Sequence, residues 1–333
     1  GRRFVGVRAG LVAAWGYALF LPVAYLATSR VADSLIPALV IATFALLVRA
    51  LDGASFKWYA ASGAVLGLTC LLRPDMLLLP SFLLIVAASR AQARVRAVVG
   101  VALLGVTAFA MLIPWGVRNL RELGSFQIAS LAGGMSLYQS VGQFPNPYGI
   151  VFDDGASADS ARRAGFESVD DPGADRYFKR RFAAIVQENP GLLAGQALRR
   201  IPLGLAPLYH WGYDNPAYRG HGFYDYVNRD RISAYRAVFD HPLELFLAYW
   251  DRLLFGALGL LLLVAGVALI VVERERWSTA LLLQIPYLYL FLSHLPIVLG
   301  ARLLIPGVFG QLIILGYWVQ RLSTREPVHL KGI

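Results

Sequence analysis

Residues 111–138 read MLIPWGVRNLRELGSFQIASLAGGMSLY, and this stretch decides how the chain is divided. It begins at the end of an apolar run, which is predicted to end in a turn at Pro114. Trp115, Arg118 and Asn119 follow at once, where a membrane interface is expected. Because Trp and Arg are also ordinary anchors of transmembrane helices, these residue types alone assign no function. The stretch predicts the point where a membrane helix gives way to an external loop.

The composition is that of a membrane protein. Hydrophobic residues make up 57% of the 333 residues and charged residues only 16%, whereas soluble domains carry about 25% charged residues. The net charge of +10 does not indicate nucleic acid, because that partner requires a basic face with interleaved aromatics. Here the cations lie mainly in short loops between apolar runs, where they orient a protein in the bilayer.

Apolar runs predict an all-α polytopic membrane protein with about eight transmembrane helices and one large external loop. A spanning helix needs about 20 mostly apolar residues. The runs cover residues 9–27, 35–51, 59–72, 76–88, 95–113, 253–272, 279–295 and 303–319. The third and fourth are short, and a re-entrant pair would give the same pattern. The domains are then residues 1–114 with five spans, the loop 115–252, and residues 253–333 with three spans and a cytoplasmic tail.

Arginine and lysine are distributed unequally between alternate loops. One side carries Arg2, Arg3, Arg8, Arg49, Lys57, Arg90, Arg94, Arg96, Arg274, Arg276, Arg321, Arg325 and Lys331. The short loops of the other side hold only Arg30, Arg73 and Arg302. Since positive loops stay in the cytoplasm, the chain is expected to be a multi-pass protein of the plasma (inner) membrane with the long loop outside.

The long loop is predicted to carry structure of its own. Amphipathic spacing predicts a helix over residues 174–188, and Asn189-Pro190 predicts the start of a second helix that ends near Arg200. The acidic residues 153–175 are expected to be mobile. Residues 209–226 are dense in aromatics, which suit either a sugar ring or a membrane interface. His210 and His221 lack a recognised ligand spacing, so no metal site is predicted.

Three segments in order resemble GT-C type glycosyltransferases of family 39, the dolichyl-phosphate-mannose protein mannosyltransferase-like group that includes the lipid A aminoarabinose transferases. The segments are LTCLLRPDMLLLP (68–80), PWGVRNLRELGSFQIASLAGGMSLY (114–138) and ARLLIPG (301–307). Ser136 stands where the family usually has Asn, which leaves the role of the predicted turn over residues 133–138 open.

The resemblance implies a bacterial cell-envelope enzyme that moves a hexosyl or pentosyl group from a polyprenyl-phosphate carrier. The acceptor is a glycan, lipid or protein at the outer face of the membrane. In this family the catalytic base lies in an acidic loop after the first transmembrane helix. No segment here matches that loop, so the chain is expected to be a fragment whose base lies upstream of Gly1. No cofactor is required by any motif, and a divalent cation is left open.

The candidate site residues follow from the resemblance and from the leaving group. A departing lipid phosphate needs cations, and Arg118, Arg302 and Arg73 are the candidates to contact it. Asp33, Asp75, Asn119 and Tyr138 are expected to support the site. Simpler roles stay open, since Asp33 also suits a helix N-cap and Arg73 also suits an ion pair with Asp75.

Two other functions stay open. A transporter or flippase for a lipid-linked or anionic substrate would show inverted repeats, broken helices and ionisable residues near the middle of the bilayer. The sequence instead places its ionisable residues at one membrane face and spends more than a hundred residues on one loop. A non-catalytic membrane subunit is the third reading, because the expected catalytic loop is absent.

Overall fold

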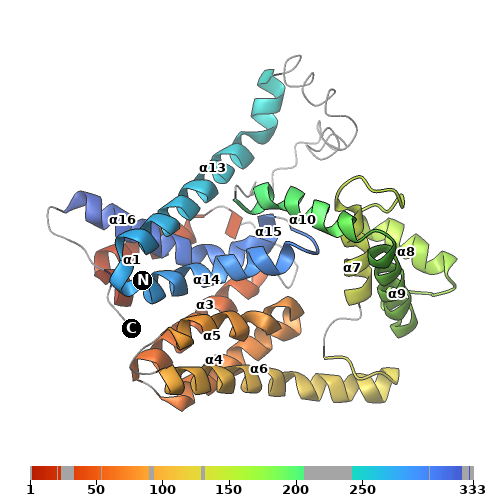
Figure 1. The fold of residues 1–333 in the computed structure, drawn as a ribbon, viewed down its shortest axis with the longest axis horizontal. Helices are drawn as coiled ribbons and strands as arrows, with labels where there is room; N and C mark the ends of the chain where they lie inside the picture. Colours follow the sequence, from red (N-terminus) through yellow and green to blue (C-terminus); the bar gives the residue numbers. More distant parts are fainter. Residues whose placement is uncertain are drawn as a thin grey trace. The chain divides into compact units, whose positions relative to one another are not determined.

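The structure is a computed structural model that describes residues 2–20, 22–23, 34–53, 55–89, 94–128, 132–205, 242–299, 301–324 and 330. These residues form helices and their connections, with no strand among them (Figure 1). The chain divides into two compact units. The apolar unit comprises Gly1–Leu131, Leu261–His294 and Leu303–Ile333, and the loop unit comprises Ala132–Leu260 and Leu295–Arg302.

The apolar unit is a bundle of helices. Its elements are α1 (Arg2–Ala18), α3 (Ile36–Gly53), α4 (Phe56–Leu72), the 3₁₀ helix η2 (Pro74–Leu78), α5 (Leu79–Ala88), α6 (Arg94–Leu123), η5 (Arg274–Arg276), α14 (Trp277–His294), η6 (Ile305–Gly307) and α16 (Val308–Ser323). Helix α4 packs between α3 and α6. A Cβ on Gly63 would lie 2.3 Å from the Leu104 carbonyl oxygen, and one on Gly67 would lie 2.5 Å from Met111 Cβ. Small residues therefore let α4 and α6 approach closely, as in membrane helix pairs.

Two described helices, α3 with 18 residues and α6 with 30, are long and apolar enough to cross a membrane. A third span results if Gly256–Val272 and Arg274–His294, which meet at a bend of 101°, are counted as one. Phe56–Leu72 and Pro74–Ala88 are apolar but shorter. The all-helical prediction is confirmed for the described residues, and eight spans stay a prediction.

Helix α6 does not end at Pro114, so the turn predicted there is wrong. The helix continues to Leu123, with Pro114 in its interior. Gly116 allows the ring of Phe126 to approach, since a Cβ there would lie 2.7 Å from that ring. The helix stops before Gly124, whose φ of 64° is the left-handed conformation in which many helices end. A Pro costs a helix one hydrogen bond, and packing on the segment after Gly124 supports the extra turns.

The loop unit is also helical. Its elements are α7 (Gly133–Ser140), η3 (Val141–Gln143), α8 (Asp154–Arg163), α9 (Pro172–Glu188) and α10 (Pro190–Leu205), together with the first parts of α13 (Pro242–Val272) and α15 (Ala301–Leu304), whose remaining residues belong to the apolar unit. Both predicted amphipathic helices are confirmed, and α10 extends past Arg200. Residues 153–175, expected to be mobile, include the helix α8. Asp153 caps that helix by accepting a hydrogen bond from the Ala156 amide at 2.7 Å.

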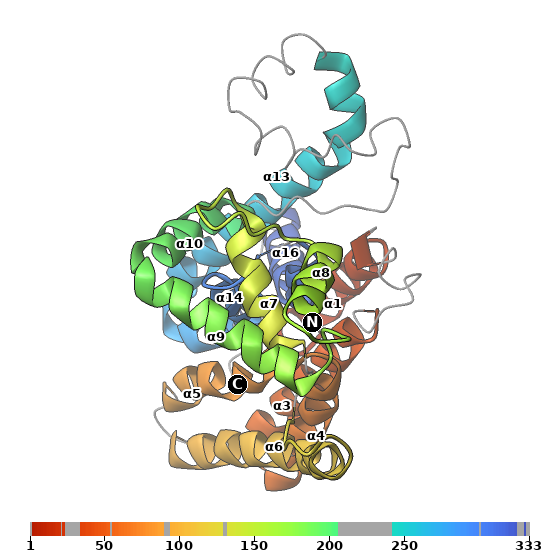
Figure 2. The same ribbon diagram turned by 90° about the vertical axis from the view of Figure 1, so that its right-hand side faces the viewer.

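The predicted turn at residues 133–138 is wrong, because these residues belong to α7. Figure 2 shows α7 beside α9. The Gly134 amide donates to Asp175 Oδ1 at 2.7 Å, and a Cβ on Gly134 would lie 2.2 Å from the Asp175 carbonyl oxygen. Tyr138 packs against Phe178, with ring centroids 5.2 Å apart. The Gly-Gly motif thus serves the close approach of two helices.

Candidate functional site

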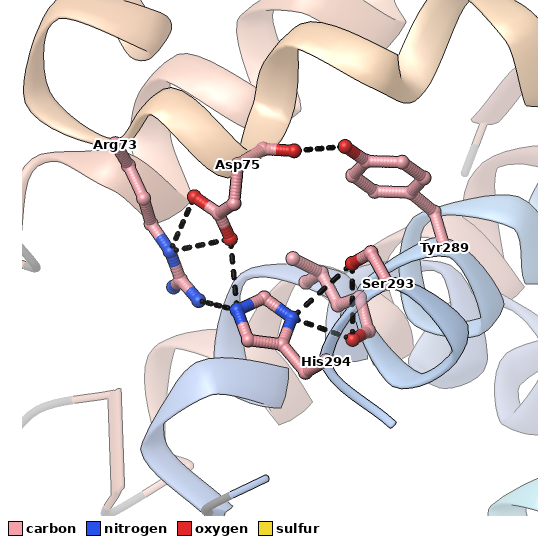
Figure 3. A network of polar contacts seen from close by, with 6 residues as sticks. Arg73, Asp75, Tyr289, Ser293 and His294 are labelled. Atoms are coloured by element: carbon pink, nitrogen blue, oxygen red, sulfur yellow. Dashed lines mark hydrogen bonds and ion pairs between the residues drawn. The ribbon is translucent and has the colours of Figure 1, made fainter. Parts of the chain in front are cut away.

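Three polar side chains meet inside the apolar unit (Figure 3). Arg73 and Asp75 lie in the connection between α4 and α5, and His294 is the last residue of α14. Pro74 begins η2 and leaves Arg73 in an extended conformation, with φ −147° and ψ 92°. Figure 3 shows the side chain of Arg73 pointing toward Asp75 and His294. Arg73 and His294 are both buried, with exposed fractions of 7% and 8%.

The contacts among the three side chains are short. Arg73 Nε lies 3.1 and 3.0 Å from the two carboxylate oxygens of Asp75, and Arg73 Nη2 lies 3.1 Å from His294 Nε2. His294 Nε2 is also 2.9 Å from Asp75 Oδ2. The Tyr289 hydroxyl donates to the backbone carbonyl of Asp75. Together these bonds fasten the α4–α5 connection to α14.

The surroundings of His294 fix one of its two protons. Its Nδ1 is 2.7 Å from the Leu290 carbonyl oxygen, which can only accept, so Nδ1 carries a hydrogen. Its Nε2 then faces both a guanidinium, which only donates, and a carboxylate, which accepts. A neutral imidazole accepts from Arg73 at Nε2, and an imidazolium donates to Asp75.

Asp75 lies in η2, the connection between α4 and α5, and outside the spans predicted over residues 59–72 and 76–88. Burial raises the pKa of its carboxyl, but the hydrogen bond from His294 and the positive charge of Arg73 lower it by more. The net pKa is below the ordinary value, so Asp75 is ionised at neutral pH. Arg73 uses Nε and Nη2 in this cluster, and its Nη1 makes no hydrogen bond to any described residue. That nitrogen is the one with which Arg73 can donate to a bound anion.

Arg118 and Asn119 form a second polar group, near the C-terminal end of α6. The exposed Arg118 guanidinium lies 4.9 Å from the centre of the Trp115 ring and donates to Asn119 Oδ1 at 3.2 Å. Asn119 is buried and donates to the Gln127 carbonyl at 2.7 Å. The stack and the hydrogen bond orient Arg118 while leaving it open to solvent, as a phosphate ligand requires.

Of the remaining predicted residues, the structure describes the side chain of Tyr138. Tyr138 lies in the loop unit and packs on α9. Arg302 belongs to the short helix α15, and its side chain, like the whole of Asp33, falls outside the described residues. The aromatic stretch with His210 and His221 is also outside them. Within the described part of the chain, no group of three or more His, Cys, Asp or Glu residues is placed to hold a metal.

Sequence reasoning missed His294. It lies 221 residues from Arg73 along the chain, so no local pattern connects the two. One signal was available, since an ionisable residue at the end of an apolar run is by default a candidate for function.

Comparison with known proteins finds a family model that matches part of the chain. Residues 1–117 of the 333 match the family model described as dolichyl-phosphate-mannose-protein mannosyltransferase. Neither a curated protein nor a solved structure matches the chain. The matched region contains Arg73 and Asp75 and ends one residue before Arg118. Over these residues the chain is similar to that mannosyltransferase family, and the match supports a GT-C glycosyltransferase-like membrane protein.

Proposed function

We propose that this protein is a membrane glycosyltransferase that moves a sugar from a polyprenyl-phosphate carrier to an acceptor at the outer face of the plasma membrane. The observation that carries the proposal is the family match over residues 1–117. The match supports glycosyl transfer in a membrane, and the two membrane-length helices α3 and α6 agree with it. The polyprenyl-phosphate donor is the finer part of the proposal, and it requires cations where the lipid phosphate departs.

Arg118 is our first candidate to contact that phosphate. Negative charge grows on the phosphate as the bond to the sugar breaks, so a positioned cation lowers the barrier. Arg118 is exposed and already oriented by Trp115 and Asn119. Arg302 and the Nη1 of Arg73 are the further candidates, and Asp75 and His294 support Arg73 by holding its other nitrogens. We assign no general base among the described residues.

The test is an assay of the purified full-length protein in proteoliposomes with polyprenyl-phosphate-linked hexoses and pentoses. We expect release of polyprenyl phosphate that depends on an added acceptor. Arg118→Gln should slow release by about a hundred- to a thousand-fold, the usual effect of removing one donor to a developing oxyanion. Arg118→Lys should recover part of the rate because it keeps the charge without the planar fork.

Arg121 supplies the matched control for Arg118. It is an exposed arginine one turn further along α6, so Arg121→Gln removes the same charge from the same helix. Its release rate should stay within a few fold of the wild-type rate. Equal losses for the two variants would mean that α6 contributes only diffuse positive charge, and they would remove Arg118 from the site.

A transporter or flippase is the second candidate, because one observation favours it. The 101° bend between Gly256–Val272 and Arg274–His294 is the kind of break found in transporter helices. A flippase moves the lipid-linked sugar across the bilayer and leaves the sugar–phosphate bond intact. Translocation of a fluorescent lipid-linked sugar with no release of polyprenyl phosphate would therefore overturn the glycosyltransferase proposal.

A further inference from the structure

Arg200, in helix α10 of the loop unit, is completely buried. Its side chain has five N–H donors, and the structure supplies five oxygen contacts. These are Nε to Gln143 Oε1 at 2.8 Å, Nη1 to the carbonyls of Leu295 and Pro296 at 3.2 Å each, and Nη2 to the Ser140 carbonyl at 2.8 Å and Gln196 Oε1 at 3.0 Å. The guanidinium thus has an acceptor for each of its hydrogens.

All five acceptors are neutral. No ion pair joins Arg200 to a carboxylate among the residues that the structure describes. Burial lowers the pKa of Arg200 to about 10, so the side chain is still charged at neutral pH. A buried charge without a counter-ion is costly, and an apolar side chain would fill the same space without that cost. The reason for an arginine here must lie in what its hydrogen bonds hold together.

Two of the five contacts of Arg200 are made to one segment, residues 295–299, and a third is made to Gln143, which also holds that segment. Residues 295–299 belong to Leu295–Arg302, which groups with the loop unit. Besides the two carbonyls bound by Arg200, the segment is held by Gln143, which donates to the Leu299 carbonyl at 2.6 Å and accepts from the Leu299 amide at 3.2 Å. Gln196 donates to the Val141 carbonyl at 2.8 Å. Arg200, Gln143 and Gln196 therefore tie η3 and α10 to residues 295–299.

The segment stands between two candidate site residues along the chain. His294, of the Arg73 cluster, comes directly before Leu295, and Arg302 follows Leu299 by three residues. We propose that Arg200 is a positioning residue that fixes residues 295–299 and thereby sets where Arg302 can reach the carrier phosphate. This inference rests on the proposed function, because it takes Arg302 as a contact of that phosphate.

The geometry requires a guanidinium. Its planar fork donates to acceptors on three segments at once, whereas the ammonium of lysine offers three donors from one point. Lysine at position 200 keeps the charge but must leave several of the five acceptors unpaired. A role in charge alone would tolerate Arg200→Lys, and a role in positioning would not.

The first arm of the test measures how firmly Arg200 and Gln143 hold residues 295–299, an arrangement that we call the clamp. It needs no activity assay. In the full-length protein in nanodiscs, amide hydrogen exchange in Leu295–Arg302 should be faster in Arg200→Lys than in the wild type. Arg199, the exposed neighbour on the same helix, supplies the control, and Arg199→Lys should leave this exchange unchanged. Gln143→Met keeps Arg200 and four of its five contacts but removes the bonds of Gln143 to Leu299 and to Arg200 Nε, so it serves if Arg200→Lys folds poorly. Unchanged exchange in a folded Arg200→Lys or Gln143→Met variant would overturn the clamp.

The second arm measures transfer per folded molecule. We expect Arg200→Lys to lower kcat by about tenfold or more, the equivalent of one broken buried hydrogen-bond network, with little change in the KM for the acceptor. If Arg200 acts through Arg302, adding Arg200→Lys to Arg302→Gln should cost no more than about a further twofold. Losses that multiply in the double variant would contradict the proposed route through Arg302. A wild-type protein that transfers no sugar contradicts the proposed function instead, and the exchange arm still decides the clamp.

Discussion

At the scale of single residues, Asp75 supplies the counter-charge for the buried guanidinium of Arg73. Their side chains are 27% and 9% exposed and lie 3.0 Å apart. Asp75→Asn leaves the guanidinium buried without a counter-charge, so it should lower the free energy of unfolding by about 3 kcal/mol, as when other buried pairs lose one partner. Thermal unfolding of the detergent-solubilised protein measures the loss.

Two controls separate the ion pair from simple loss of packing. Arg73→Met together with Asp75→Asn leaves no unpaired charge, so the double variant should be more stable than Asp75→Asn alone. The pH dependence is the second control. Because the pKa of Asp75 is lowered in the folded protein, its contribution is present above the unfolded value of about 3.9 and is lost as the pH falls through the folded value. Asp75→Asn should therefore be furthest below wild type near neutral pH, and a constant difference down to pH 3 would contradict this role.

At the scale of elements, Gly133 and Gly134 make a matched pair. A Cβ on Gly134 would lie 2.2 Å from the backbone oxygen of Asp175, whereas a Cβ on Gly133 meets only Asp175 Oδ1, at 3.8 Å. Gly134→Ala must push α7 away from α9 and should cost about 1–3 kcal/mol, the usual cost of overpacking. Gly133→Ala should be neutral within about 0.5 kcal/mol. The rate of proteolysis within α7–α9 compares the two variants, and equal rates would show that α7 is not held this closely.

The element scale also shows how far sequence reasoning reaches. The amphipathic helices α9 and α10 were predicted because their apolar spacing and Asn189-Pro190 are local signals. The end of α6 was predicted wrongly. Pro114 is the strongest local signal for a helix end, but packing around Gly116 stabilises the helix as far as Leu123, just before Gly124. Gly133-Gly134 was interpreted as a turn because the sequence does not show its contact with α9. That contact joins Gly134 and Asp175, which are 41 residues apart.

Some residues of the candidate site could be predicted from the sequence, and others could not. The Arg73–Asp75 pair was foreseen as one of two roles because its members are two residues apart. His294 and the five contacts of Arg200 were not, since they depend on how distant helices pack and on connections that leave no periodic pattern. Arg118 was found through a motif, yet its orientation by Trp115 and Asn119 depends on the helix continuing past Pro114.

At the scale of the whole molecule, the orientation in the membrane decides whether the site faces a carrier on the outer side. Helix α6 has 30 residues, a length of about 45 Å, whereas the hydrocarbon core is about 30 Å thick. About ten of its residues thus extend beyond the core. Both ends of α6 carry arginines, Arg94 and Arg96 at one and Arg118 and Arg121 at the other. The charges of α6 alone do not orient it, and the assignment depends on all the short loops.

Cysteine labelling of intact cells tests that orientation. Ser168, between α8 and α9, and Glu275, in η5, are both exposed, whereas Ser157 is buried and unsuitable. The sequence has one cysteine, Cys70, which is buried, so Cys70→Ala gives a silent background. Because positive loops stay inside, Ser168→Cys should react with a membrane-impermeant maleimide and Glu275→Cys only after permeabilisation. Labelling of Glu275→Cys in intact cells would place the Arg274–Arg276 connection outside, and transfer at the outer face would then have to be abandoned.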